Sequence, residues 1–325
     1  MKTALFGLAA FIVIIAAIDG GMIAFGTSAP PQPLTSIGAP FKKVDFSDLP
    51  ALETIPARNG GTIAFRRWTS PETTAPGPIV IAIHGSSGSS TSLHPLGKAL
   101  RAERFTLYAP DVRGHGGTGQ RGDIDYSGQL DDDFADFIAA LKSRHPGQPF
   151  ALMGFSSGGG YALHLSASAL GSEFQRAILL SPMLGPRAPT VKITGDAWAS
   201  PFLPRIFGLI FLNKLGIHNF DYLTTLAFAI DPVQAKFLTG TYSFRLMQAF
   251  GTAGYAADLK NARPAVQVLV GSSDELFAAD RFAPTIHAVR LDIPVTIVPG
   301  VNHIGLTTDP QAVPAIVAAL HGAQT

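Results

Sequence analysis

Short apolar runs alternate with longer mixed stretches through most of the chain. Residues 79–83 are apolar at every position, which is typical of a strand buried on both faces of a parallel sheet. Runs of the same kind follow at 105–109, 150–153, 177–180, 266–270 and 295–298. Helices are predicted between most of them, at 93–104, 128–144, 158–170, 279–289 and 310–320. This alternation predicts an α/β fold with a mostly parallel central sheet flanked by helices.

Two segments depart from the alternation. Residues 54–68 contain two short strand-like runs around Asn59-Gly60-Gly61, which is a hairpin signal. Residues 183–263 separate two strands that should be neighbours in the sheet, and this separation is far longer than a typical connecting loop. We therefore predict a folded domain at 41–325 with a mainly helical, aromatic-rich cap inserted at 183–263.

The N-terminal 27 residues contain one long apolar run instead of short runs that alternate with mixed stretches. Residues 4–18 contain no polar side chain, and Asp19-Gly20-Gly21 interrupts the run before it resumes through residue 25. As a helix this segment would be about 33 Å long, which is enough to cross a bilayer. We predict an uncleaved membrane anchor or a cleaved export signal at 1–27, with a buried helix as the third alternative. A Pro-rich linker follows at 28–40, and the domain after it would be exported to the periplasm or the extracellular space, tethered to the membrane or secreted.

The amino-acid composition excludes some classes of binding partner and some kinds of catalytic site. The formal net charge of +1 provides no electrostatic attraction for a polyanion, so no nucleic-acid partner is predicted. The chain has no cysteine, which excludes disulfides, thiolate catalysis and cysteine-bound metal. Charged residues make up only 14% of the chain, below the roughly 25% of an average soluble protein.

Gly154-Phe155-Ser156-Ser157-Gly158 matches the pattern G-x-S-x-G. The motif follows an apolar strand and precedes a helix of small residues. A serine at such a sharp turn is exposed in a strained backbone conformation, and only small neighbours leave room for it. Ser156 is therefore the predicted nucleophile.

A serine hydroxyl needs a base, and the base needs a carboxylate that orients it. His303 follows the last predicted strand, at the edge of the sheet where α/β folds bind ligands, whereas several other histidines fall in or beside helices. Asp274 follows the preceding strand and is favoured over Glu275 and Asp280. The chain order Ser156, Asp274, His303 is that of α/β-hydrolases.

Acyl transfer also needs donors for the oxyanion that forms at the carbonyl. The backbone N–H groups of Ser86, in His84-Gly85-Ser86, and of Ser157 are the predicted oxyanion hole. The alternative for residues 84–90 is a flexible Ser/Gly loop.

Three further signals have plainer explanations. Residues 114–119 match G-x-G-x-x-G, but a polar loop follows where a nucleotide site needs a helix. Asp131-Asp132-Asp133 and Asp136 fit a solvated helix face better than a metal site. The apolar stretch at 202–217 could form the core of the cap, line an acyl pocket or contact a membrane.

Together these motifs resemble α/β-hydrolases close to monoacylglycerol lipases and lysophospholipases, the serine aminopeptidase S33-like branch, over residues 54–320. The matching pieces are His84-Gly85, residues 110–116, Gly154–Gly158, Asp274 and His303. The resemblance implies a cap after the sixth strand and cofactor-independent cleavage of carboxylic esters with apolar or lipid-like acyl chains. Amide or peptide hydrolysis, acyl transfer on the same triad and a non-catalytic binding protein remain alternatives. The natural ester and the oligomeric state are left open.

Overall fold

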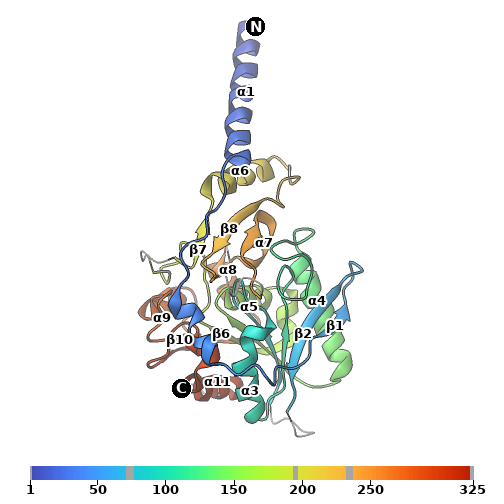
Figure 1. Cartoon of the computed structure of the whole chain (residues 1–325), viewed down its shortest axis with the longest axis vertical. Helices are drawn as coiled ribbons and strands as arrows, with labels where there is room; N and C mark the ends of the chain where they lie inside the picture. Colours follow the sequence, from blue (N-terminus) through green and yellow to red (C-terminus); the bar gives the residue numbers. More distant parts are fainter. Residues whose placement is uncertain (1, 71–76, 193–196, 232–236, 253, 323–325) are drawn as a thin grey trace.

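The computed structural model describes residues 2–70, 77–192, 197–231, 237–252 and 254–322, and an eight-stranded sheet forms their centre (Figure 1). The strands are β1 (Glu53–Pro56), β2 (Thr62–Trp68), β3 (Ile79–Ile83), β4 (Leu107–Pro110), β5 (Phe150–Phe155), β6 (Phe174–Leu180), β10 (Ala265–Gly271) and β11 (Val295–Val298). Their order across the sheet is β1-β2-β4-β3-β5-β6-β10-β11. The β1–β2 and β2–β4 pairs are antiparallel, and the pairs from β4 to β11 are parallel.

Helices cover both faces of this sheet. They are α3 (His94–Ala102), α4 (Gln129–Arg144), α5 (Ser157–Ala167), α9 (Ala279–His287), α10 (Gly305–Thr308) and α11 (Val313–His321). Apolar side chains of α4, α5 and α9 share one buried core, and those of α3 and α11 share a second core with the opposite side chains of the strands. Every residue of β3 and of β5 is buried, as the uninterrupted apolar runs require. The predicted α/β-hydrolase architecture is confirmed.

A cap lies between β6 and β10. It contains β7 (Ala199–Pro201), α6 (Leu203–Lys214), β8 (Thr224–Phe228), β9 (Thr241–Ser243), α7 (Phe244–Phe250) and α8 (Tyr255–Asn261). The strands form a three-stranded antiparallel sheet, which the sequence analysis did not anticipate because strands of three to five residues carry too little periodicity. Parts of the predicted insertion, at 193–196, 232–236 and 253, lie outside the described residues. The boundaries 183–263 and 41–325 stay predictions.

The N-terminal helix α1 (Lys2–Ala24) projects from the cap, and its last turns pack against α6 (Figure 1). Ile23 is buried there beside Gly208, where a Cβ atom would lie 2.7 Å from the Ile23 side chain. Arg205 of α6 donates a hydrogen bond to the carbonyl oxygen of Ile23 at 2.8 Å. Asp19 is also buried, and that burial raises the pKa of its carboxyl group.

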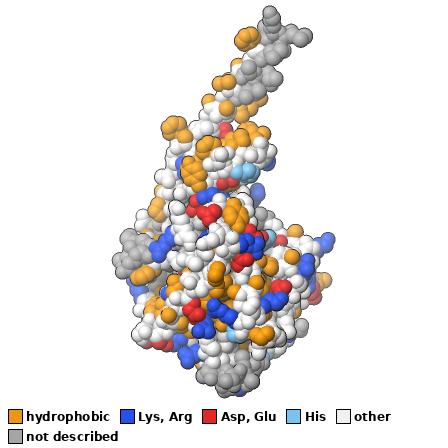
Figure 2. Space-filling view, turned by 90° about the vertical axis from the view of Figure 1, so that its right-hand side faces the viewer, with side chains coloured by type: hydrophobic (Ala, Val, Ile, Leu, Met, Phe, Trp, Pro, Cys, Tyr) orange, Lys and Arg blue, Asp and Glu red, His pale blue; other side chains and the backbone are white. Residues whose placement is uncertain are grey.

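The predicted location, an exported domain that is tethered to the membrane or secreted, is wrong. In the part of the chain that the structure describes, no helix combines the length and the apolarity that crossing a membrane requires. Asp19-Gly20-Gly21 breaks the apolar run, and the end of the helix is instead part of the contact with the cap. Apolar side chains such as Phe207 and Phe211 stay exposed on α6. Figure 2 shows hydrophobic side chains gathered at the surface of the cap, next to the N-terminal helix.

Candidate active site

Ser156 stands at the turn between β5 and α5 with φ of 54° and ψ of −120°. This left-handed φ is strained for a residue with a side chain. Both flanking glycines are sterically required. A Cβ atom on Gly154 would lie 2.2 Å from the carbonyl oxygen of Gly158, and one on Gly158 would lie 2.2 Å from that of His84. The pattern G-x-S-x-G therefore reflects close approach of three backbone segments around the serine.

His303 lies in the loop between β11 and α10, and its ring reaches Ser156. The distance from His303 Nε2 to Ser156 Oγ is 3.1 Å, and that from His303 Nδ1 to Asp274 Oδ2 is 2.8 Å. The rings of Phe155 and Phe277 contact the imidazole, with centroid distances of 4.8 and 5.1 Å. The structure thus brings the three residues predicted as a triad into one hydrogen-bonded line, in a ring orientation that packing fixes.

Asp274 follows β10 and is almost completely buried. Its Oδ2 accepts a hydrogen bond from the Ser181 hydroxyl at 2.7 Å, and its Oδ1 accepts the backbone N–H groups of Leu276 and Phe277 at 2.9 and 2.8 Å. Burial raises the pKa of this carboxyl group, but attraction to His303 and these hydrogen bonds outweigh it and hold the pKa below its usual value. Asp274 is therefore poised to remain a carboxylate beside the imidazole.

The two competing carboxylates have other positions. Glu275 Oε2 accepts the backbone N–H of His303 at 3.0 Å, so Glu275 supports the loop rather than the ring. Asp280 has 80% of its side chain exposed in the first turn of α9, beside Arg281.

The two predicted oxyanion donors come from two different elements near the nucleophile. Ser86 follows β3 and lines the same cavity as Ser156, whereas Ser157 is the first residue of α5. The indole N–H of Trp198, from the cap, donates a hydrogen bond to Ser86 Oγ at 2.8 Å. The roles of both backbone N–H groups stay predictions.

A buried network that the sequence analysis missed connects the cap to the loop after β3. The backbone N–H of Ser87 donates to the Tyr242 hydroxyl at 2.8 Å, and Ser87 Oγ donates to the carbonyl oxygen of Thr239 at 2.7 Å. The Tyr242 hydroxyl in turn bonds His115 Nε2. Burial lowers the pKa of His115, and His84 beside it lowers that pKa further. No local signal could reveal this network, since Ser87 and Tyr242 are 155 positions apart.

The remaining sequence signals are part of the scaffold. The turn at 114–119 closes around Asp111, whose Oδ2 accepts the N–H of Gly117 at 2.8 Å. On α4, Asp133 bonds Arg113 in a buried ion pair and Asp131 bonds Tyr161. These contacts explain the glycines and the carboxylates without a ligand.

Ser156 and His303 open onto a cavity of about 570 Å³, a size that is usual for small-molecule sites. The loop after β3 forms one side of the cavity, and the cap contributes Trp198, Ile230 and Leu238. The segment that precedes β1 contributes Ile37 and Phe41.

The sheet order, the strained serine at the β5–α5 turn and the cap above it define the α/β-hydrolase class. Residues 74–308 match the sequence model of the family described as "Serine aminopeptidase, S33", and the chain belongs to that family. The predicted resemblance to the monoacylglycerol lipase branch is confirmed.

Curated relatives share part of this region. The chain is 30% identical over 124 residues to monoacylglycerol lipase of Mycolicibacterium smegmatis, which covers 38% of this chain and 43% of the relative. It is 26% identical over 144 residues to human monoglyceride lipase, covering 44% and 46%. Protein phosphatase methylesterase 1 of Bos taurus is 30% identical over 140 residues, covering 40% and 36%. The chain thus spans less than half the length of these relatives.

Solved structures share the fold at low identity. A soluble variant of monoglyceride lipase from Saccharomyces cerevisiae, solved with a substrate analogue, superposes with a TM-score of 0.64 at 16% identity, covering 87% of this chain and 99% of the other. A putative aryl esterase from Burkholderia cenocepacia gives a TM-score of 0.58 at 19% identity, covering 84% and 98%.

Proposed function

We propose that the protein is a serine hydrolase that cleaves carboxylic esters with apolar acyl chains through an acyl-enzyme. The observation that carries the proposal is the line of hydrogen bonds from Asp274 through His303 to Ser156, of which His303 and Ser156 line a partly apolar cavity. The names of the relatives, two glyceride lipases and a methylesterase, support ester bonds as the target.

The proposed mechanism assigns each side chain one task. Ser156 Oγ attacks the ester carbonyl carbon while His303 Nε2 accepts its proton, and Asp274 stabilises the imidazolium that forms. The N–H groups of Ser86 and Ser157 bind the oxyanion, where the loss of one donor costs about 10²–10³ in kcat in comparable sites. The alkoxide leaves with the proton from His303, and water then cleaves the acyl-enzyme by the same route. The products are an acid and an alcohol, and no cofactor takes part.

The test is labelling by a fluorophosphonate probe together with hydrolysis of p-nitrophenyl esters. Wild type should react with the probe and hydrolyse esters, and Ser156→Ala should lose labelling and about five orders of magnitude or more in kcat. Ser157→Ala is the matched control, because it keeps the backbone N–H and removes only the neighbouring hydroxyl. Equal labelling of wild type and Ser156→Ala would reject the assignment.

A matched panel of amide, peptide and ester substrates tests the reaction class. An acyl-ester preference is expected to persist at equal acyl length. Faster cleavage of aminoacyl amides than of esters would identify a peptidase instead, and transfer to an added alcohol in place of water would identify an acyltransferase.

A further inference from the structure

Residues 26–49, which we call the strap, are held at both ends. At the first end, Arg205 Nη2 donates to the carbonyl oxygen of Gly26 at 2.7 Å, and the Ser28 hydroxyl donates to the carbonyl oxygen of Ser200. Both partners belong to the cap. The beginning of the strap is therefore attached to the cap, directly after the contact between α1 and α6.

The other end of the strap is attached to the core. Asp48 accepts hydrogen bonds from Lys98 Nζ at 2.9 Å and from His94 Nε2 at 3.1 Å. The Phe46 ring stacks on the His94 ring, with a centroid distance of 5.7 Å. His94 is completely buried and also accepts the indole N–H of Trp68 on β2, so this end rests on a rigid part of the fold.

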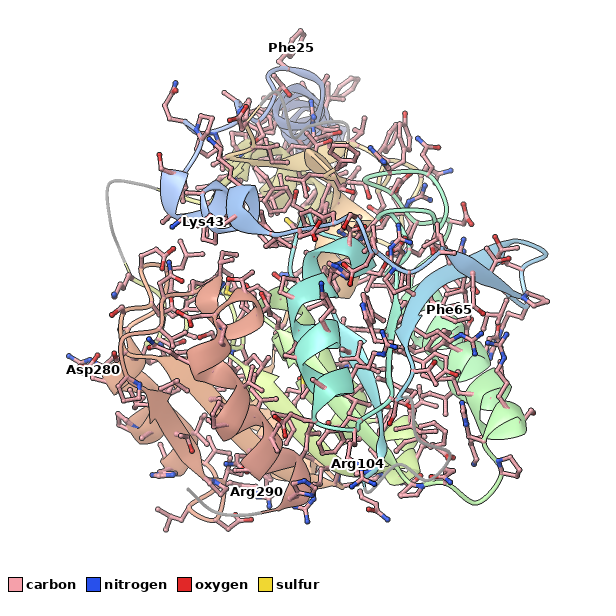
Figure 3. The ribbon with its side chains drawn as sticks, turned by 60° about the horizontal axis from the view of Figure 1, so that its bottom comes forward. Phe25, Lys43, Phe65, Arg104, Asp280 and Arg290 are labelled. Carbon is pink, nitrogen blue, oxygen red and sulfur yellow. The ribbon has the colours of Figure 1, made fainter. Side chains whose placement is uncertain are left out.

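Between the two attachments the strap lines the cavity. It forms α2 (Thr35–Gly38) and the short helix η1 (Pro40–Lys43), which Figure 3 shows between the cap and the helices of the core, near the labelled Lys43. Leu34, Ile37 and Phe41 line the cavity from this side. These side chains are only partly buried, although Ile37 and Phe41 also pack against the core. The strap thus presents unfilled apolar surface to the space above Ser156.

The position of η1 connects this surface to the proposed chemistry. The helix η1 contacts α10, which begins two residues after His303, and Ile304 and Thr307 line the cavity beside Phe41. An acyl chain that extends from a carbonyl at Ser156 into the cavity therefore meets apolar surface of the strap and of the cap, the latter at Ile230 and Leu238. The alkyl chain of the acyl group is bonded to the reacting carbonyl carbon and stays bonded to it in the acyl-enzyme, so the position of Ser156 fixes where the chain begins.

We propose that the strap is one wall of the acyl-binding site and that Leu34, Ile37 and Phe41 select esters with long alkyl chains. This inference rests on the proposed esterase function and names the part of the chain that sets its substrate preference. The strap lies outside residues 74–308, so the preference would be a property of this chain rather than of the family domain. Each methylene that the wall covers is expected to raise kcat/KM about fourfold, until the cavity is filled.

The experiment measures kcat/KM for p-nitrophenyl esters from acetate to palmitate with the full-length chain. Wild type should prefer longer chains over acetate. In the Ile37→Ala/Phe41→Ala double variant the ratio of decanoate to acetate kcat/KM should fall at least tenfold. Lys43→Ala is the matched control. Lys43 lies in η1 with Phe41, is exposed and does not line the cavity, so this substitution should leave the ratio of decanoate to acetate kcat/KM unchanged.

A second variant keeps the test decisive if the double variant does not fold. Ile37→Trp adds volume to the wall and should move the optimum to shorter esters without loss of the fold. Active-site labelling counts the competent sites in every preparation. If labelled enzyme hydrolyses esters but neither variant changes the chain-length profile, the role of the strap is overturned while the esterase function stands. If wild type neither labels nor hydrolyses any ester, both proposals fail.

Discussion

At Ser156 a single backbone conformation explains a five-residue motif. An ordinary strand or helix would give Ser156 a negative φ, so the surrounding fold must hold the residue at its φ of 54°. Gly154 and Gly158 make this possible because they have no side chain. This requirement is local, which is why Ser156 could be predicted from the sequence. Ser181 could not, because its partner Asp274 is 93 positions away and an isolated serine has no distinguishing pattern.

Ser181 gives a prediction at the scale of one hydrogen bond. Its hydroxyl helps to lower the pKa of Asp274, and a lowered folded-state pKa contributes stability that is present above about pH 4 and lost as pH falls through the folded pKa. Ser181→Ala should lower the free energy of unfolding at pH 7 by about 1.5–3 kcal/mol. The difference from wild type should shrink as pH falls below 4 toward the lowered folded pKa, because the Asp274 carboxyl group of the folded wild-type protein then begins to take up a proton.

Urea unfolding at pH 7 and pH 3.5 checks this expectation. Ser172→Ala is the control, since Ser172 is exposed and bonds only the carbonyl oxygen of Ala169 in the interactions described. A destabilisation by Ser181→Ala that is equal at both pH values would contradict the role assigned to Asp274.

At the scale of helices and strands, the agreement between the predicted and the observed bounds depends on the length and the burial of each segment. The apolar run of β3 was located at its observed bounds, because a strand inside a parallel sheet must be apolar throughout. The bounds of β11 were also located, although this edge strand contains Thr296 and is only partly buried. The cap strands were missed because their pairing depends on partners such as β7 and β8, which are far apart in the chain. A still longer separation, 155 positions, hides the hydrogen bond between Tyr242 of β9 and Ser87 in the loop after β3.

Two buried histidines near the loop after β3 make the free energy of unfolding depend on pH near neutrality. Burial lowers the pKa of both His84 and His115, whereas an unfolded histidine has a pKa of about 6.5. Stability from this pair is therefore present above about pH 6.5 and lost as pH falls toward the lower folded values. The free energy of unfolding should decrease from pH 7 to pH 5. His115→Gln should remove up to about 1.4 kcal/mol per pH unit from that slope.

Denaturant titrations at several pH values provide the measurement. His321→Gln, at the exposed end of α11, should keep the wild-type slope. An unchanged slope in His115→Gln would show that His115 is not held neutral by the fold.

At the scale of the whole molecule, the N-terminal segment is where sequence and structure disagree most. Hydropathy measures a segment by itself, but the burial of Ile23 and Asp19 comes from α6, and Arg205 bonds Ile23 across 182 positions. The same reasoning applies to residues 28–40. Their prolines predict a linker, yet the structure has α2 there, and the stretch lines the cavity.

Arg205 tests how firmly this segment is attached. Its guanidinium donates to the carbonyl oxygens of Ile23, Gly26 and Thr224, which a lysine cannot reproduce because it lacks the planar fork. Arg205→Lys should lower the free energy of unfolding by about 2–4 kcal/mol. Limited proteolysis between residues 26 and 34 should become at least tenfold faster. Arg101→Lys, at the exposed end of α3, is the control, and equal cleavage rates in all three proteins would contradict the attachment.

The double attachment of the strap has a consequence for engineering. Caps of α/β-hydrolases look modular, since each begins and ends at neighbouring strands of the sheet. Here one side of the substrate cavity comes from residues that precede the first strand. A chimera that receives only this cap would lack the part of the cavity wall that the strap forms, and grafting the proposed substrate preference requires residues 26–49 and their contacts at Arg205 and His94 as well.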